Sequence, residues 1–128
     1  LSFGMTDMAW HTLTEPFEGD VEQFEAVSMA PTQVLPVVSG TAMAPAFGHI
    51  FSGGYAAGYY GYKWAEVLEA DAFSLFKEKG IFNREAASSF RENVLSKGGT
   101  EHPMELYVRF RGHKPETRAL IEKMGLGK

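Results

Sequence analysis

Apolar residues recur along this chain at intervals of three and four, in stretches separated by proline, glycine and capping residues. This spacing predicts amphipathic helices, and no stretch shows the strict alternation typical of a half-buried strand. We therefore predict an all-α fold in which helices pack on a long central helix. The predicted helices cover residues 1–13, 21–27, 54–79, 84–96, 104–110 and 116–124.

Several helix ends carry recognisable signals. Asp20 and Asn83 stand where a side chain would cap a following helix, and Pro103 stands at a first helical position. Pro31 ends the second helix, because its ring cannot join the hydrogen-bond ladder of the helix before it. Residues 32–48 should be ordered but largely irregular, and long segments of this kind are often functional.

Composition limits the possible partners and cofactors. The chain has 128 residues, a net charge of -4 and scattered basic residues, which favours one domain and argues against a nucleic-acid partner. It has no cysteine, so disulfides and thiolate metal sites are excluded. No run of 18 apolar residues exists, so no transmembrane helix is predicted, and the negative net charge gives no reason to expect a membrane partner. The chain starts with Leu1, and its first residues look like the middle of a helix, which favours a piece cut from a longer protein.

The most informative stretch runs from Phe47 to Trp64. Tyr55, Tyr59 and Tyr62 are spaced i, i+4, i+7 and should share one helix face. A tyrosine hydroxyl keeps its proton at neutral pH, so it can donate to the oxyanion of a tetrahedral intermediate. The alternative is a set of core tyrosines with satisfied hydroxyls.

A second candidate site lies near the start of the chain. Asp7, His11 and Glu15 are four residues apart and could bind a divalent metal on one helix face. The alternative, which we favour, is a solvated face with weak ion pairs. The sequence contains no His-Glu-x-x-His motif, so we expect no complete zinc site within it.

The 47–73 stretch resembles the family of zinc metallopeptidases that includes thimet oligopeptidase, neurolysin, oligopeptidase A and peptidyl-dipeptidase Dcp. The resemblance continues in Asp7-Met8-Ala9-Trp10-His11, Phe90-Arg91, Gly98-Gly99, Pro103–Tyr107 and Phe110-Arg111-Gly112, and so covers essentially the whole chain. The spacing of His49 and Tyr55 is similar to that of the bacterial members.

This resemblance implies a concrete role. Residues 1–128 would be the helical C-terminal portion of a mostly helical, clam-like catalytic domain that hydrolyses short peptides. Zinc would be held by a His-Glu-x-x-His segment and a downstream glutamate, all in the missing N-terminal part of the same protein. No zinc is expected to bind this chain, and the chain alone should be inactive.

The resemblance also implies roles for individual residues. Tyr62 would donate to the oxyanion, while Tyr55 and His49 would bind substrate or stabilise the same intermediate. Tyr59 would contact substrate, and the loop at Gly53 and Gly54 would close on the peptide.

Three readings follow from the sequence. The first is this part of an oligopeptidase or peptidyl-dipeptidase, placed in the cytoplasm or alternatively the periplasm. The second is a stand-alone helical module that binds peptides without catalysis. The third is a small metal protein. Under the first, an exposed apolar face should meet the missing part and promote self-association of the chain.

Overall fold

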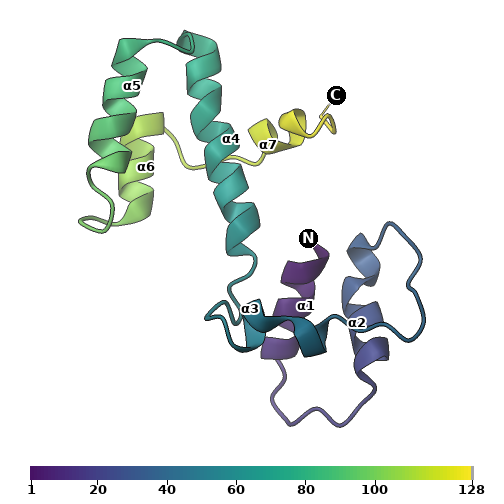
Figure 1. Ribbon diagram of the computed structural model, residues 1–128. Coiled ribbons are helices and arrows are strands. Elements are labelled where there is room, and N and C mark those ends of the chain that lie inside the picture. Colours follow the sequence, from purple (N-terminus) through teal and green to yellow (C-terminus); the bar gives the residue numbers. More distant parts are fainter. Residues whose placement is uncertain (128) are drawn as a thin grey trace. The chain divides into compact units, whose positions relative to one another are not determined.

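A computed structural model describes residues 1–127, and its regular elements are all helical (Figure 1). No strand occurs among the described residues, so the predicted all-α fold is confirmed. The chain folds as two compact units, Leu1–Lys63 and Trp64–Lys128. In neither unit do the described residues form a helix long and apolar enough to cross a membrane.

The first unit is built from three α-helices and two short 3-10 turns. They are α1 (Ser2–His11), α2 (Val21–Met29), η1 (Ala30–Thr32), η2 (Ala44–Ala46) and α3 (Gly48–Phe51). Asp20 caps α2 by accepting a hydrogen bond from the backbone N–H of Gln23 at 2.9 Å, as predicted. Pro31 falls in η1 directly after α2, which confirms that this helix stops there.

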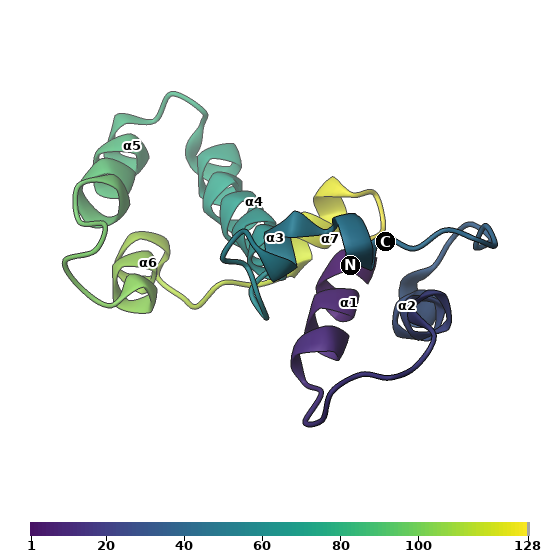
Figure 2. The same ribbon diagram turned by 60° about the horizontal axis from the view of Figure 1, so that its bottom comes forward.

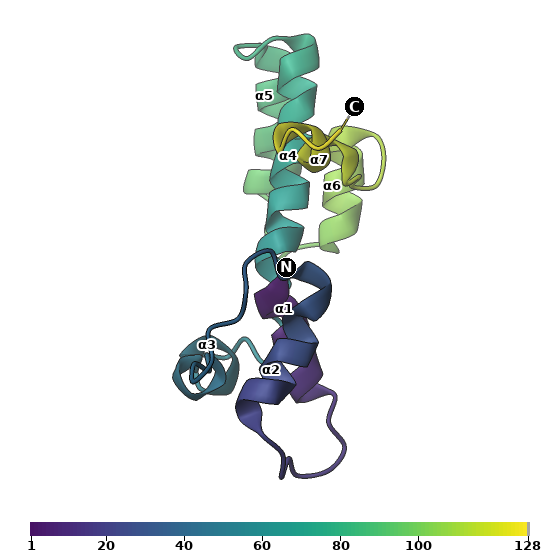
Figure 3. The same ribbon diagram turned by 90° about the vertical axis from the view of Figure 1, so that its right-hand side faces the viewer.

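Aromatic side chains join the helices of the first unit. α1 and α2 lie side by side in Figures 1 and 3, with the ring of Trp10 4.3 Å from that of Phe24 and 4.9 Å from that of Phe17. α3 lies beside α1 (Figure 2). The ring of Phe51, at the end of α3, is 6.0 Å from that of Trp10. These ring contacts fix the segment that leads to the tyrosines.

The second unit begins inside the longest helix. Its elements are α4 (Gly61–Lys79, whose first residues belong to the first unit), α5 (Arg84–Phe90), η3 (Arg91–Leu95, π-helical), α6 (Pro103–Arg111) and α7 (Arg118–Lys123). Asn83 caps α5 by accepting from the N–H of Ala86, and Pro103 is the first residue of α6; both were predicted. Figure 1 shows α5 and α6 alongside each other.

The core of the second unit combines rings with one polar network. The rings of Phe76, Phe90 and Phe110 lie 5.1 to 6.4 Å apart. The buried hydroxyl of Tyr107 donates to the Asp71 carboxylate at 2.5 Å. Burial and this hydrogen bond both raise the pKa of Tyr107 well above its usual value.

Two predicted helix starts are wrong. The central helix begins at Gly61 rather than Gly54, because the backbone turns through positive φ at Gly54 (79°) and Ala57 (52°), which no α-helix accommodates. The last helix begins at Arg118, three residues after Pro115. The first of these corrections changes how the tyrosines are held.

Candidate functional site

Four aromatic side chains named from the sequence form one cluster in the first unit. The His49 ring lies 5.8 Å from the rings of both Tyr55 and Tyr59, and 6.4 Å from that of Tyr62. Tyr62 in turn lies 5.5 Å from Tyr55 and 5.0 Å from Tyr59. The structure thus brings the four side chains together, but the predicted single helix face is wrong: only Tyr62 lies in α4, and Tyr55 and Tyr59 precede that helix.

The cluster is open to solvent on part of its surface. Tyr55 is 43% exposed and Tyr62 is 45% exposed, and the His49 side chain is also exposed. Tyr59 is half-buried, because its ring packs against those of Phe47 at 5.0 Å and Phe3 at 5.9 Å. Tyr59 therefore anchors the cluster to the core, while the other rings can meet a ligand.

A tight turn at the paired glycines brings Tyr55 back to His49. The Tyr55 N–H donates to the His49 carbonyl at 3.0 Å. A Cβ on Gly53 would lie 3.0 Å from the His49 Cα and 3.1 Å from the Gly48 carbonyl oxygen, so a side chain there would push against backbone. Gly54 has a φ of 79°, which L residues rarely adopt. Both glycines are thus required by the geometry of the turn.

The Tyr62 hydroxyl is held in its protonated form. A hydrogen bond with the Tyr55 side chain is the main reason that the pKa of Tyr62 is raised, and the neighbouring phenols add to the effect. The neutral hydroxyl is the form that can donate to a substrate oxygen. The cluster can therefore offer phenol donors across neutral and mildly alkaline pH.

Two acidic side chains hold the backbone around the cluster. Asp7, fully buried in α1, accepts from the N–H groups of Ala57 at 2.9 Å and Tyr59 at 2.8 Å. Glu25, buried in α2, accepts from the N–H groups of Met43 at 2.7 Å and of Ala44. The sequence analysis did not predict either role; the only local signal was a carboxylate that directly neighbours large apolar residues, Met8 after Asp7 and Phe24 before Glu25.

The metal site considered at Asp7, His11 and Glu15 does not form. α1 ends at His11, so Glu15 lies beyond the helix and is exposed. Both Asp7 oxygens already accept backbone N–H groups, and the His11 Nδ1 lies 2.8 Å from the Asp7 Oδ1. Within residues 1–127, no three His, Cys, Asp or Glu side chains are grouped so that they could hold a metal ion.

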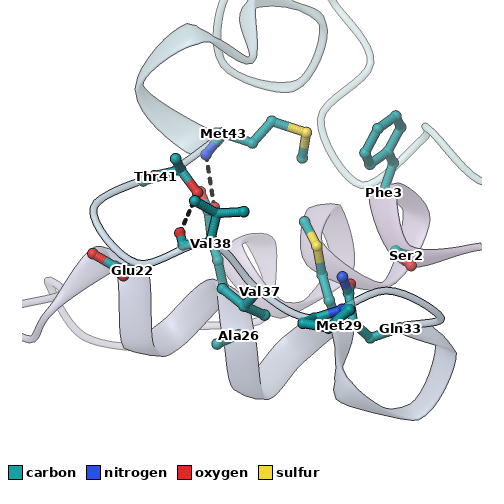
Figure 4. A pocket seen from close by; sticks show the side chains of 13 residues that line it. Ser2, Phe3, Glu22, Ala26, Met29, Gln33, Val37, Val38, Thr41 and Met43 are labelled. Carbon is teal, nitrogen blue, oxygen red and sulfur yellow. Dashed lines mark hydrogen bonds between the residues drawn. The ribbon is translucent and has the colours of Figure 1, made fainter.

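A separate hollow of about 530 Å³ lies between α2 and the segment 36–43 (Figure 4). Phe3, Ala26, Met29, Val37 and Val38 supply much of its lining. Its two carboxylates, Glu22 and Glu25, accept backbone N–H groups from the same segment. The hollow includes none of the four clustered rings and offers mainly apolar contact.

Comparison with known proteins gives the family of the chain. The model of peptidase family M3 matches residues 1–126. The chain belongs to peptidase family M3. The resemblance noted from the sequence is thereby confirmed.

The relatives with similar sequences include oligopeptidase A proteins and a dipeptidyl carboxypeptidase. Oligopeptidase A of Escherichia coli (strain K12) is 48% identical over 127 residues, which cover 98% of this chain and 19% of the relative. "Probable cytosolic oligopeptidase A" of Arabidopsis thaliana is 41% identical over 132 residues, covering 98% and 19%. The dipeptidyl carboxypeptidase of E. coli (strain K12) is 39% identical over 128 residues, with the same coverage. The chain thus spans 19% of the length of these M3 peptidases.

Proposed function

We propose that residues 1–128 form the C-terminal part of the catalytic domain of an oligopeptidase or peptidyl-dipeptidase that hydrolyses short peptides. One observation carries the proposal: the rings of His49, Tyr55, Tyr59 and Tyr62 converge at an anchored turn, and Tyr55 and Tyr62 remain exposed there. Membership of a peptidase family supports the reaction class. The name of one relative supports a cytoplasmic place, which we propose as well.

In this proposal, Tyr62 is the oxyanion donor. Tyr62 is a neutral phenol with a pKa above its ordinary value, so it keeps its proton and can turn it from Tyr55 toward the scissile carbonyl oxygen as negative charge develops there. The Tyr55 ring stacks on that of Tyr62 and brings a second phenol hydroxyl beside it. His49 lies within ring contact of both and binds the substrate or the same intermediate.

The remaining site residues bind the peptide. Tyr59 has its ring anchored between Phe3 and Phe47, which presents a fixed surface to a substrate chain. Gly53 and Gly54 expose a backbone turn without side chains, against which an extended peptide can lie closely.

The zinc ion implied by the resemblance belongs elsewhere in the protein. The described residues present no cluster that fits a metal ion, so we assign the ligands to the part of the same protein beyond this chain. That part is also the proposed partner of the chain. The chain's own share of the reaction is then to bind peptide and stabilise charge, and by itself it should be inactive.

The test is Tyr62→Phe in the intact enzyme, with Tyr60→Phe as the matched control. Tyr60 lies two residues before Tyr62 and is 59% exposed. Unlike Tyr62, it makes no ring contact with the other clustered side chains. Loss of one oxyanion donor should lower kcat by roughly 100- to 1,000-fold. KM should change little, because the interaction is made in the transition state.

The control variant should keep both constants. Unchanged turnover in Tyr62→Phe would overturn the oxyanion role. Peptide binding by the isolated chain, measured calorimetrically without metal, would then favour the peptide-binding module instead.

A further inference from the structure

Asp7 is one of the most completely buried side chains of the first unit. It lies in α1 with 0% exposure, among a chain stretch rich in apolar residues. Burying a carboxylate is costly unless hydrogen bonds replace its water shell. The partners of Asp7 therefore indicate what the burial achieves.

Both Asp7 oxygens accept from the turn that carries the tyrosines. Oδ1 accepts from the Ala57 N–H at 2.9 Å, and Oδ2 accepts from the Tyr59 N–H at 2.8 Å. These donors lie 50 and 52 residues later in the chain. Ala57 has a φ of 52°, which is uncommon for a residue with a side chain, so the turn needs outside support.

His11 holds the carboxylate in place. Its Nδ1 lies 2.8 Å from Asp7 Oδ1 and 2.8 Å from the Asp7 backbone carbonyl, one helical turn earlier. The His11 ring also lies 5.7 Å from the Phe51 ring of α3, which restricts its own movement. The Asp7 side chain is thus fixed from both sides.

We propose that Asp7 is a positioning residue for the reaction: its carboxylate fixes the Ala57–Tyr59 backbone and thereby sets the mutual placement of Tyr55, Tyr59 and Tyr62. This inference rests on the proposed function of the tyrosine cluster. Asp7 does not touch substrate in this scheme. It acts through the turn that lies between the two stacked tyrosines.

Asp7→Asn is the sharpest substitution, because it keeps size and shape. The amide oxygen can accept from one of the two N–H groups, while the amide NH₂ faces the other donor. Asp20→Asn is the matched control: Asp20 also accepts a backbone N–H in the same unit, from Gln23, but has no link to the tyrosines.

Two measurements on the intact enzyme test the proposal. In Asp7→Asn, kcat should fall roughly 10- to 100-fold, as expected for a small misplacement of catalytic groups. On a Tyr62→Phe background, the same change should cost no more than about threefold, because coupled residues are not additive. Amide hydrogen exchange should rise at residues 55–60 in Asp7→Asn and stay unchanged in Asp20→Asn.

The outcomes separate the two hypotheses. If Tyr62→Phe alone leaves turnover unchanged, the proposed function fails. If Tyr62→Phe lowers turnover, but Asp7→Asn leaves kcat intact or lowers it equally on both backgrounds, the positioning role alone is overturned. Unchanged exchange at residues 55–60 in Asp7→Asn would overturn it as well.

Discussion

The rings of Tyr55 and Tyr62 stack with centroids 5.5 Å apart and planes inclined by 26°. Tyr55 lies in a turn and Tyr62 in the first turn of α4, so the pair is formed by the course of the backbone and not by one helix face. Their side chains also share the hydrogen bond that raises the pKa of Tyr62.

Tyr55→Phe should make the Tyr62 hydroxyl ionise at lower pH. The folded-state pKa of Tyr62 lies above the ordinary value of 10.0, and the Tyr55 hydrogen bond is the largest cause. The protonated donor is therefore present at neutral and mildly alkaline pH, and it is lost as the pH rises through the folded-state value. Removing Tyr55 should move the alkaline limb of the kcat profile to lower pH, measured in the intact enzyme. Tyr60→Phe is the control, and a limb that does not move would contradict the prediction.

Gly53→Ala should disturb the turn at His49. The new Cβ would lie 3.0 Å from the His49 Cα, so backbone must shift. We expect a loss of about 1 to 3 kcal/mol in the free energy of unfolding, as for other overpacked sites. Urea unfolding of the intact enzyme, with kcat measured in parallel, checks both stability and site geometry.

Gly61→Ala serves as the control for that substitution. A Cβ at Gly61, the first residue of α4, meets nothing within 4 Å. It should leave stability unchanged or raise it by up to about 1 kcal/mol, because alanine favours helix. Equal free energies of unfolding for the two alanine variants would contradict the prediction that a side chain at Gly53 strains the backbone.

Tyr107→Phe should destabilise the second unit. The substitution leaves the buried Asp71 carboxylate without its O–H donor at 2.5 Å, although Arg111 remains 3.7 Å from that carboxylate. A hydrogen bond to a charged group contributes about 1.5 to 3 kcal/mol, so a loss of this size is expected in chemical denaturation. A change below about 0.5 kcal/mol, the usual range for surface substitutions, would contradict it.

Ile81→Ser should reduce self-association of the 128-residue chain. Ile81 is 51% exposed and, with Phe73 and Phe76, lines an apolar hollow of about 520 Å³ in the second unit. We propose that this face meets the missing part of the protein, so it should drive association when that part is absent. Sedimentation velocity at increasing concentration measures the effect. Val34→Ser is the control, since Val34 is 93% exposed and lies outside this hollow. Equal association of both variants would refute the assignment of this face.

Local signals in the sequence predicted the local structure well. Asp20 and Asn83 cap the helices that follow them, because a cap depends on residues only three positions apart. The predicted start of α4 was wrong. The spacing of Tyr55, Tyr59 and Tyr62 fits one helix face, but it is equally compatible with a backbone that turns before the helix begins. Composition also gave no sign that Ala57 would adopt a positive φ.

The sequence analysis named the residues of the candidate site but did not predict the contacts that hold them in place. His49 and the three tyrosines do come together, yet their placement depends on Asp7, which lies about 50 residues away in the sequence. No local pattern can show such a contact. Asp7 is fully buried, and a buried carboxylate needs hydrogen-bond partners, which here come from a distant part of the chain.

The two hydrogen bonds of Asp7 also have a consequence for how the site forms during folding. They close loops of 50 and 52 residues, and closing such loops costs conformational entropy that other interactions must offset before either bond can form. We therefore expect α1 and the tyrosine turn to join late, after α1 and α2 have paired. A polypeptide lacking the first eleven residues would still contain every tyrosine of the cluster, and yet it would have lost the acceptor that gives them their arrangement.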